Sequence, residues 1–359
     1  MKIKIDNKIP YINYFTEGLN IDIDLFDDQS FKLDSLSEDS IVVIRSTYKT
    51  HGLEAPEFLK LLCSVSAGED HVDKDHLDKK SIDYSFSSGA NSCAVAEYFF
   101  SCLALLLKKR AFKFEKDRVL VVGNGNIGSR IYKTLKEFSF NVDTYDPFKE
   151  STIKNLNHID DYGVITFHIP LTNNTAYPTK GLVNKLFLEK MRKNSWIINT
   201  SRGGIVNEED FMSQNKVSMI SDVFNNEPNI NKDFQKSCYL STPHIAGHTQ
   251  FSRYQMTKMA FEKIFAFLKL RAPTFKGLEC PDPEPLNIRQ LELDFSDYGF
   301  PVDLILNTYD PTLDKFKYAE FKKFRDNYHN RLGFAQKGII LNDHRYKTLI
   351  KKIGFCINS

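Results

Sequence analysis

The sequence has neither an excess of charge of one sign nor a long uninterrupted hydrophobic run. Its 48 Lys and Arg residues nearly balance 46 Asp and Glu residues, giving a formal net charge of +2. Such a chain lacks the basic field with which proteins coat nucleic acid or anionic membranes. The longest apolar run, residues 99–107, is interrupted by Ser101 and is shorter than the roughly 20 residues that span a bilayer. We therefore expect a protein with no nucleic-acid partner and no membrane partner.

Cysteine is also sparse, and its spacing excludes two further classes. The six cysteines include no CxxC pair and no Cys/His ligand spacing, so neither structural zinc nor a disulfide scaffold is expected, and we predict no metal site. The amino terminus, residues 1–6, has no apolar signal core. These features favour reduced thiols and a cytoplasmic location.

The pattern of apolar segments indicates an α/β protein with more than one domain. The 359 residues, 42% of them hydrophobic and 26% charged, suit two or three globular domains. Residues 1–90 alternate strands, such as 40–44 and 61–65, with polar segments. Residues 92–110 are apolar nearly all round, which predicts a buried helix closed by cations at its carboxyl end.

From Arg118 onward the chain repeats a rhythm of strand, turn and helix, which predicts a doubly wound parallel sheet. Prolines after residue 270 indicate a linker, and the last 75 or so residues resemble a separate small α/β unit. The strands expected in the sheet are 118–122, 141–145, 163–167, 196–198, 217–223 and 238–240, with a helix over 127–138. In the last unit, the apolar segments are 303–306 and 338–341, and the expected helices are 318–332 and 346–353.

A glycine-rich turn lies between a predicted strand and a predicted helix. Gly123, Gly125 and Gly128 form GxGxxG, in which the first glycine permits a tight turn and the second lets a pyrophosphate approach. The third lets the helix and strand pack closely, and the helix amides face the anion. Asp146 ends the next strand, where a carboxylate accepts bonds from ribose hydroxyls and repels a 2′-phosphate. This predicts NAD rather than NADP, and the alternative is a structural turn that binds nothing.

Three chemically capable side chains come after successive strands of the predicted sheet. Arg202, Glu227 and His244 each come just past a strand, at the edge where open parallel sheets bind ligands. An arginine can hold a carboxylate through two parallel bonds, and a histidine can exchange a proton near neutral pH. A carboxylate beside the histidine stabilises its protonated form. Singly, each residue could be an ordinary surface or packing residue, but together they suit hydride transfer involving a 2-oxo acid.

At these residues the chain resembles the D-isomer-specific 2-hydroxyacid dehydrogenases. Further likeness, along the whole chain, is to a subfamily that oxidises a phosphorylated 2-hydroxy acid. The family strings are 123–128, 167–172, 199–204, 221–228 and 242–247. The subfamily strings are 44–49, 66–73, 89–98, 307–310, 321–331 and 353–355.

The resemblance implies an architecture and roles for individual residues. It implies a flavodoxin-like substrate (lid) domain over 1–93, completed by a segment near 255–280, a Rossmann NAD domain over 94–254, and a C-terminal dimerisation domain over 281–359. The implied catalytic residues are Arg202, which binds substrate, Glu227, which supports the histidine, and His244, the proton donor. The implied cofactor contacts are Gly123, Gly125, Asn126, Ile127, Gly128, Asp146, His168, Thr200, Asp222 and Gly247. The implied substrate contacts are Ser46, Ser66 and His248, the last standing where a tyrosine is usual.

Two questions stay open at this point. Arg45 and Lys49, beside Ser46, could hold a substrate phosphate or could be solvated surface cations. The substrate could also be 3-phosphoglycerate, glyoxylate or hydroxypyruvate, or lactate, and a non-catalytic NAD-sensing scaffold like a corepressor would keep the same residues. The extra C-terminal unit favours the phosphorylated substrate, and its many aromatic residues suggest a homodimer interface.

Overall fold

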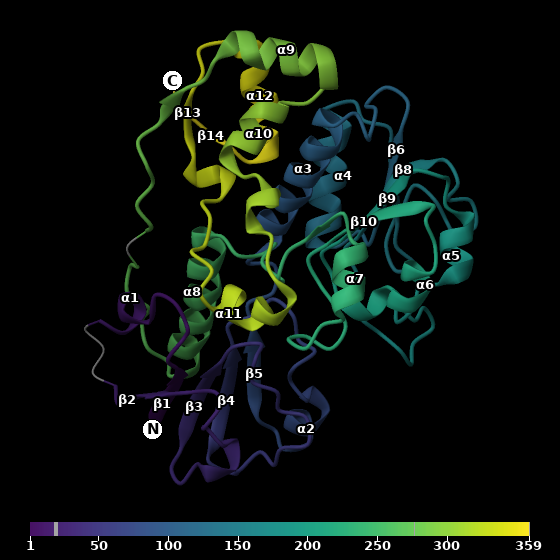
Figure 1. Ribbon diagram of the computed structural model, residues 1–359. Helices are drawn as coiled ribbons and strands as arrows, with labels where there is room; N and C mark the ends of the chain where they lie inside the picture. The colour runs from purple at the N-terminus through teal and green to yellow at the C-terminus, as the bar shows by residue number, and fades with distance from the viewer. Residues whose placement is uncertain (18–20, 276, 359) are drawn as a thin grey trace. The chain divides into compact units, whose positions relative to one another are not determined.

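The computed structural model describes residues 1–17, 21–275 and 277–358. The chain forms two compact units: Met1–Asn91 with Gln250–Glu279, and Ser92–Thr249 with Cys280–Ser359. Each unit contains its own parallel sheet, as Figure 1 shows.

The first unit is built on a five-stranded sheet in the order β2-β1-β3-β4-β5. All neighbouring strands are parallel, and this order is the flavodoxin-like one that was predicted. Apolar residues alternate between two cores: Ile41 and Val43 face one, and Val42 and Ile44 face the other. The strands are β1 (Lys2–Asp6), β2 (Ile23–Phe26), β3 (Ser40–Ile44), β4 (Leu59–Ser64) and β5 (Asp83–Phe86), and the helices are α1 (Ile12–Thr16), α2 (Lys74–Lys79) and α8 (Gln250–Phe267).

The second unit contains a six-stranded parallel sheet in the order β11-β10-β9-β8-β6-β7. The strand order reverses beside β6, and open α/β sheets bind ligands at such a switch point. The predicted doubly wound sheet is confirmed. The strands are β6 (Arg118–Val122), β7 (Val142–Tyr145), β8 (Tyr162–Phe167), β9 (Ser195–Asn199), β10 (Val217–Ser221) and β11 (Leu240–Ser241), and the helices are α4 (Asn126–Glu137), α5 (Lys185–Lys190), α6 (Glu208–Met212) and α7 (Lys232–Ser237).

Helix α3 (Ser92–Lys108) is the buried helix that the sequence predicted. Every residue from Ala94 to Leu107 is buried, and Glu97 is the one charged side chain in that stretch. The helix packs against α4 on one side and against α10 (Val302–Thr308) of the C-terminal segment, residues 280–358, on another, as Figure 1 shows. The helix is apolar on nearly all sides because other parts of the protein, and not solvent, surround it.

The C-terminal segment differs in detail from the expectation. The apolar segment 303–306 lies within a helix, α10, and the helix expected over 318–332 is wrong in its length. The α-helix observed in this stretch is the shorter α11 (Phe321–Asp326). It ends at Asn327, and Asn330 adopts a left-handed backbone with φ +57°. The elements are β12 (Glu284–Pro285), α9 (Ile288–Tyr298), α10 (Val302–Thr308), α11 (Phe321–Asp326), β13 (Gly338–Ile340), α12 (His344–Ile353) and β14 (Cys356–Asn358), and β12-β13-β14 form a parallel sheet.

The aromatic residues of this segment pack largely within the chain. Phe300, Tyr309 and Phe334 share one hydrophobic core with α3 and the six-stranded sheet, whereas Phe321 joins the core on the other face of that sheet. The segment therefore completes the second unit. Among the described residues, no helix combines the length and apolar character needed to cross a membrane.

Candidate active site

The glycine turn is shaped by close packing at its first and third glycines. Gly123 has φ +99°, and a Cβ there would lie 2.4 Å from the carbonyl oxygen of His168. A Cβ on Gly128 would lie 1.8 Å from the carbonyl oxygen of Gly123. Both positions therefore require glycine for the turn itself.

Gly125 is different, because the protein gives no packing reason for it to be glycine. A Cβ there would meet no atom within 4 Å, and no side chain caps α4, whose N-cap is Gly125. Asn126 and Ile127 begin that helix. An open backbone at a helix amino terminus fits a pyrophosphate, which needs backbone amides and no intervening side chain. The residues present thus fit a dinucleotide.

Asp146, directly after β7, is tied to the glycine turn. Its carboxylate accepts bonds from the backbone N–H of Asn124 at 2.8 Å and of Phe148 at 2.9 Å. A carboxylate has further lone pairs available after two such bonds. Asp146 therefore lies at the strand end where the sequence predicted a ribose contact.

His168 and Thr200, predicted from separate motifs, lie side by side. The Nδ1 atom of His168 is 3.3 Å from the hydroxyl of Thr200, and Nε2 is 3.0 Å from the hydroxyl of Thr166. Burial lowers the pKa of His168 to about 3, so the ring is neutral at physiological pH. A neutral ring held by two hydroxyls can shape a pocket wall but carries no charge there.

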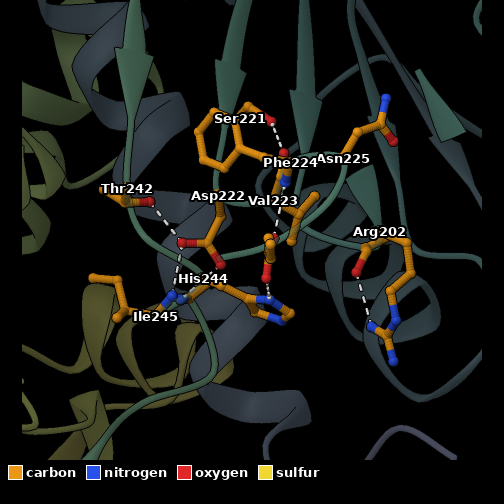
Figure 2. Close-up of polar contacts among 12 residues, drawn as sticks. Arg202, Ser221, Asp222, Val223, Phe224, Asn225, Thr242, His244 and Ile245 are labelled. Carbon is orange, nitrogen blue, oxygen red and sulfur yellow. Dashed lines mark hydrogen bonds and ion pairs between the residues drawn. The ribbon is translucent and has the colours of Figure 1, made fainter. Parts of the chain in front are cut away.

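His244, which is labelled in Figure 2, forms a hydrogen-bonded pair with Glu227. The Nδ1 atom of His244 lies 2.7 Å from Oε2 of Glu227, and Oε1 of Glu227 accepts the N–H of Phe224 at 2.9 Å. Burial acts to raise the pKa of Glu227, but the charge and hydrogen bond of His244 outweigh it, so the pKa lies below its ordinary value. With Nδ1 engaged, Nε2 is the ring nitrogen suited to exchanging a proton with a substrate.

Asp222 shapes the turn that carries His244, as Figure 2 shows. Its buried carboxylate accepts bonds from the Thr242 hydroxyl at 2.7 Å, the Ile245 N–H at 2.8 Å and the Ala246 N–H at 2.9 Å. Burial raises the pKa of Asp222 to about 6 despite these donors and the charge of His244. These bonds support the left-handed backbone of His244, φ +58°.

Arg202 comes after β9, on the loop next to the one that carries Glu227. A Cβ on Gly203 would lie 2.0 Å from the carbonyl carbon of Phe224, so only glycine lets these loops approach so closely. Asn199 donates to the Arg202 carbonyl at 3.0 Å, and Nη1 of Arg202 donates to the Ser201 carbonyl at 2.8 Å. The guanidinium is drawn beside its own loop in Figure 2.

The two remaining candidates of this unit come shortly after His244. Gly247 is buried, and the His248 ring centroid lies 6.3 Å from that of Tyr328. His248 therefore lies next to the C-terminal segment.

The four amino-terminal candidates come after β3 and β4 in the first unit. Ser46 and Ser66 are half-buried and Lys49 is exposed, and the Ser66 hydroxyl accepts the N–H of Gly68 at 3.2 Å. Arg45 is held by two carboxylates, Asp6 at 2.7 Å and Asp28 at 2.9 Å. The charge of Arg45 is therefore offset by two neighbouring carboxylates.

Sequence reasoning missed the buried residues that support Asp222 and the loop carrying His244. The Tyr98 hydroxyl lies 2.7 Å from that of Thr242, which in turn donates to Asp222. Glu97, beside Tyr98, forms a buried ion pair with Arg331 at 3.1 Å. A single acid within an otherwise apolar helix was a signal for Glu97, whereas nothing in the polar sequence around Arg331 indicated burial.

Comparison with known proteins identifies the class. Residues 106–246 match the family described as "D-isomer specific 2-hydroxyacid dehydrogenase, NAD binding domain". Together with the full-length relatives below, this match shows that the chain belongs to the D-isomer-specific 2-hydroxyacid dehydrogenases, which are NAD-dependent enzymes acting on CH–OH groups.

Two curated relatives resemble the chain over its whole length. Erythronate-4-phosphate dehydrogenase of Marinomonas sp. is 30% identical over 380 residues, and that of Hahella chejuensis is 29% identical over 387, with 100% of each chain covered in both comparisons. Among solved structures, NAD-dependent formate dehydrogenase from Staphylococcus aureus, in complex with NAD, superposes with a TM-score of 0.63 at 21% identity. That match covers 75% of this chain and 96% of the other, and it supports the fold.

Proposed function

We propose that the protein oxidises 4-phospho-D-erythronate to 2-oxo-3-hydroxy-4-phosphobutanoate with NAD, a step in pyridoxal 5′-phosphate synthesis. The observation that carries this proposal is the His244–Glu227 pair, 2.7 Å apart, beside the Arg202 loop at the carboxyl edge of an NAD-binding sheet. Relatives named for this substrate match from end to end, which favours it over other 2-hydroxy acids.

The catalytic roles are set by the chemistry of three side chains. NAD, when bound, supplies a nicotinamide ring that accepts the hydride from C2 of the substrate. His244 accepts the C2 hydroxyl proton on Nε2, while Glu227 holds the ring through Nδ1 and stabilises the imidazolium that results. Arg202 binds the substrate carboxylate and fixes the orientation of C2. These roles need no chemical group beyond the imidazole, the carboxylate and the guanidinium of these three side chains.

The cofactor contacts that we propose are those of the glycine turn and its neighbours. Gly125 and the first residues of α4 hold the pyrophosphate, Asp146 holds the adenosine ribose and Asp222 holds the nicotinamide carboxamide. The full proposed set is Gly123, Gly125, Asn126, Ile127, Gly128, Asp146, His168, Thr200, Asp222 and Gly247.

For the substrate we propose contacts from the hydroxyls of Ser46 and Ser66 and from the ring of His248. Lys49 is the better of the two candidate phosphate ligands, because its ammonium group is exposed whereas the charge of Arg45 is compensated. We assign residues 1–93, with the segment near 255–280, to the substrate domain and 94–254 to the NAD domain. We further propose that 281–359 forms a homodimer contact, with the protein in the cytoplasm. Leu293 and Leu313, 52% and 80% exposed, support the dimer proposal.

The test is a substrate panel. Formation of NADH is followed by absorbance while the protein is given 4-phospho-D-erythronate, D-3-phosphoglycerate, D-glycerate or D-lactate. We expect the highest kcat/KM with the first compound. A higher kcat/KM with another acid would reassign the substrate, and NADH binding without turnover of any acid would indicate a non-catalytic NAD sensor.

A further inference from the structure

A buried arginine of the C-terminal segment, Arg331, contacts the loop that carries His244. Arg331 is 5% exposed, and its Nη2 atom donates to the carbonyl oxygens of Ala246 at 3.1 Å and Ala94 at 2.7 Å. Its Nη1 atom donates to Glu97 at 3.1 Å. One side chain thus joins the His244 loop to the first turn of α3.

The guanidinium is itself fixed from several sides. Its Cζ lies 4.2 Å from the ring centroid of Tyr309, and the Tyr309 hydroxyl donates to Asp314 at 2.8 Å. The backbone of Arg331 also forms a parallel bridge with Thr249. A side chain packed and bonded in this way has one available position.

The loop that carries His244, residues 243–249, is therefore fixed both through its N–H groups and through a carbonyl group. Asp222 accepts the N–H groups of Ile245 and Ala246, and Arg331 donates to the Ala246 carbonyl two residues after His244. Because His244 has a left-handed backbone, φ +58°, which non-glycine residues adopt uncommonly, its conformation depends on such neighbouring bonds.

We propose that Arg331 is a positioning residue for the proton-transferring His244, through its bond to the Ala246 carbonyl. The C-terminal segment then contributes to catalysis, and not only to packing or assembly. This inference rests on the proposed role of His244. The competing explanation is that the Arg331–Glu97 pair only stabilises the packing of the segment on α3.

The test uses variants that separate these explanations. The double variant Arg331→Met with Glu97→Gln removes the guanidinium without leaving an unpaired buried carboxylate, and Arg331→Lys retains one cation. The matched control carries Arg192→Met with Asp117→Asn, which removes the ion pair between Arg192 and buried Asp117 in the same way. Asp117 and Arg192 precede β6 and β9, at the amino edge of the sheet, opposite the site.

We expect the double variant to lower kcat by about 10- to 100-fold, because a small misplacement of a catalytic group has effects of this size. The KM for NAD should change by less than about threefold, since the cofactor contacts remain. Arg331→Lys should recover part of kcat. Amide hydrogen exchange by mass spectrometry should show faster exchange in residues 243–249 of the double variant, with the β6–β9 strands unchanged.

The exchange measurement needs no substrate, so it judges the inference separately from the proposed function. Unchanged exchange at 243–249, or an equal fall of kcat in the control that carries Arg192→Met with Asp117→Asn, would overturn the positioning role. If the double variant does not fold, Arg331→Lys decides by the same two readouts. Faster exchange at 243–249 in the double variant, together with a wild-type protein that oxidises no acid tested, would refute the function and leave the support of the loop by Arg331 intact.

Discussion

The Nδ1 atom of His244 lies 2.7 Å from Oε2 of Glu227, although the residues are 17 positions apart in the chain. They meet because Glu227 comes after β10 and His244 after β11, and these neighbouring strands are parallel. Parallel strands deliver the residues after their carboxyl ends to one edge of the sheet.

Replacement of His244 should abolish turnover and spare cofactor binding. We expect His244→Asn to lower kcat by about 10²- to 10⁴-fold, the usual effect of removing a general base. Asparagine tolerates the left-handed backbone at this position. NADH affinity, measured by fluorescence titration, should stay within about threefold of wild type, because the histidine acts on the substrate proton. The control is His158→Asn, at an exposed histidine. A His244→Asn enzyme with near wild-type kcat would assign proton transfer to another residue.

Replacement of Glu227 should change the pH profile. The pKa of Glu227 lies below its ordinary value because His244 outweighs the opposing effect of burial, so the group is a carboxylate throughout the working range. That carboxylate stabilises the imidazolium of His244, and Glu227→Gln removes this stabilisation. The acidic limb of kcat/KM for acid oxidation should therefore move to lower pH. An unmoved acidic limb would mean that the pair does not govern proton uptake.

Replacement of Asp146 should weaken discrimination between NAD and NADP. Asp146→Ala removes the carboxylate that repels a 2′-phosphate and also the acceptor for the Asn124 N–H. We expect a higher Kd for NADH and a smaller ratio of the two Kd values, measured by fluorescence titration. Asp160→Ala, at an exposed residue of the same domain, should bind both cofactors as wild type does. A wild-type protein that binds NADPH more tightly than NADH contradicts the prediction.

Asp222 should make stability depend on pH in a direction opposite to that of a paired surface carboxylate. Burial raises its pKa to about 6, so the folded state binds this proton more readily than the unfolded chain. The stabilisation is complete only below the ordinary value of 3.8 and is lost as pH rises through about 6. Asp222→Asn lacks this titration, so its free energy of unfolding relative to wild type should increase from about pH 4 to about pH 7, by roughly 2–3 kcal/mol.

Urea unfolding at the two pH values gives this comparison. Asp160→Asn should differ from wild type by the same amount at both. A pH-independent difference between Asp222→Asn and wild type would show that ionised Asp222 is not penalised by burial.

The sheet and its edge could be predicted because their signals are local. Continuous apolar runs such as 118–122 are long enough to indicate buried strands, and the glycine turn marks the end of β6 and the start of α4. The segment 303–306 was less informative, since a short apolar run fits a helix or a strand, and packing on α3 makes it part of α10. The helix over 318–332 fails because its apolar spacing continues past Asn327, where the backbone turns.

The support of the site could not be predicted, because it depends on contacts between distant segments. Arg331 and Glu97 are 234 residues apart and the Tyr98 and Thr242 hydroxyls 144, and one sequence contains no signal for such pairs. Arg45 illustrates the same limit: its sequence context left a phosphate ligand and a solvated surface cation both open, and the carboxylates of Asp6 and Asp28 that contact it come from other elements.

Transfer of a substrate hydrogen to the cofactor tests the account most directly. The protein is incubated with NAD and 4-phospho-D-erythronate carrying deuterium at C2, and the reduced cofactor is examined by mass spectrometry. The account predicts one deuterium in the NADH formed by wild type, and almost no NADH from His244→Asn in the same time. Absence of NADH, or NADH without deuterium, would contradict oxidation by hydride transfer from C2.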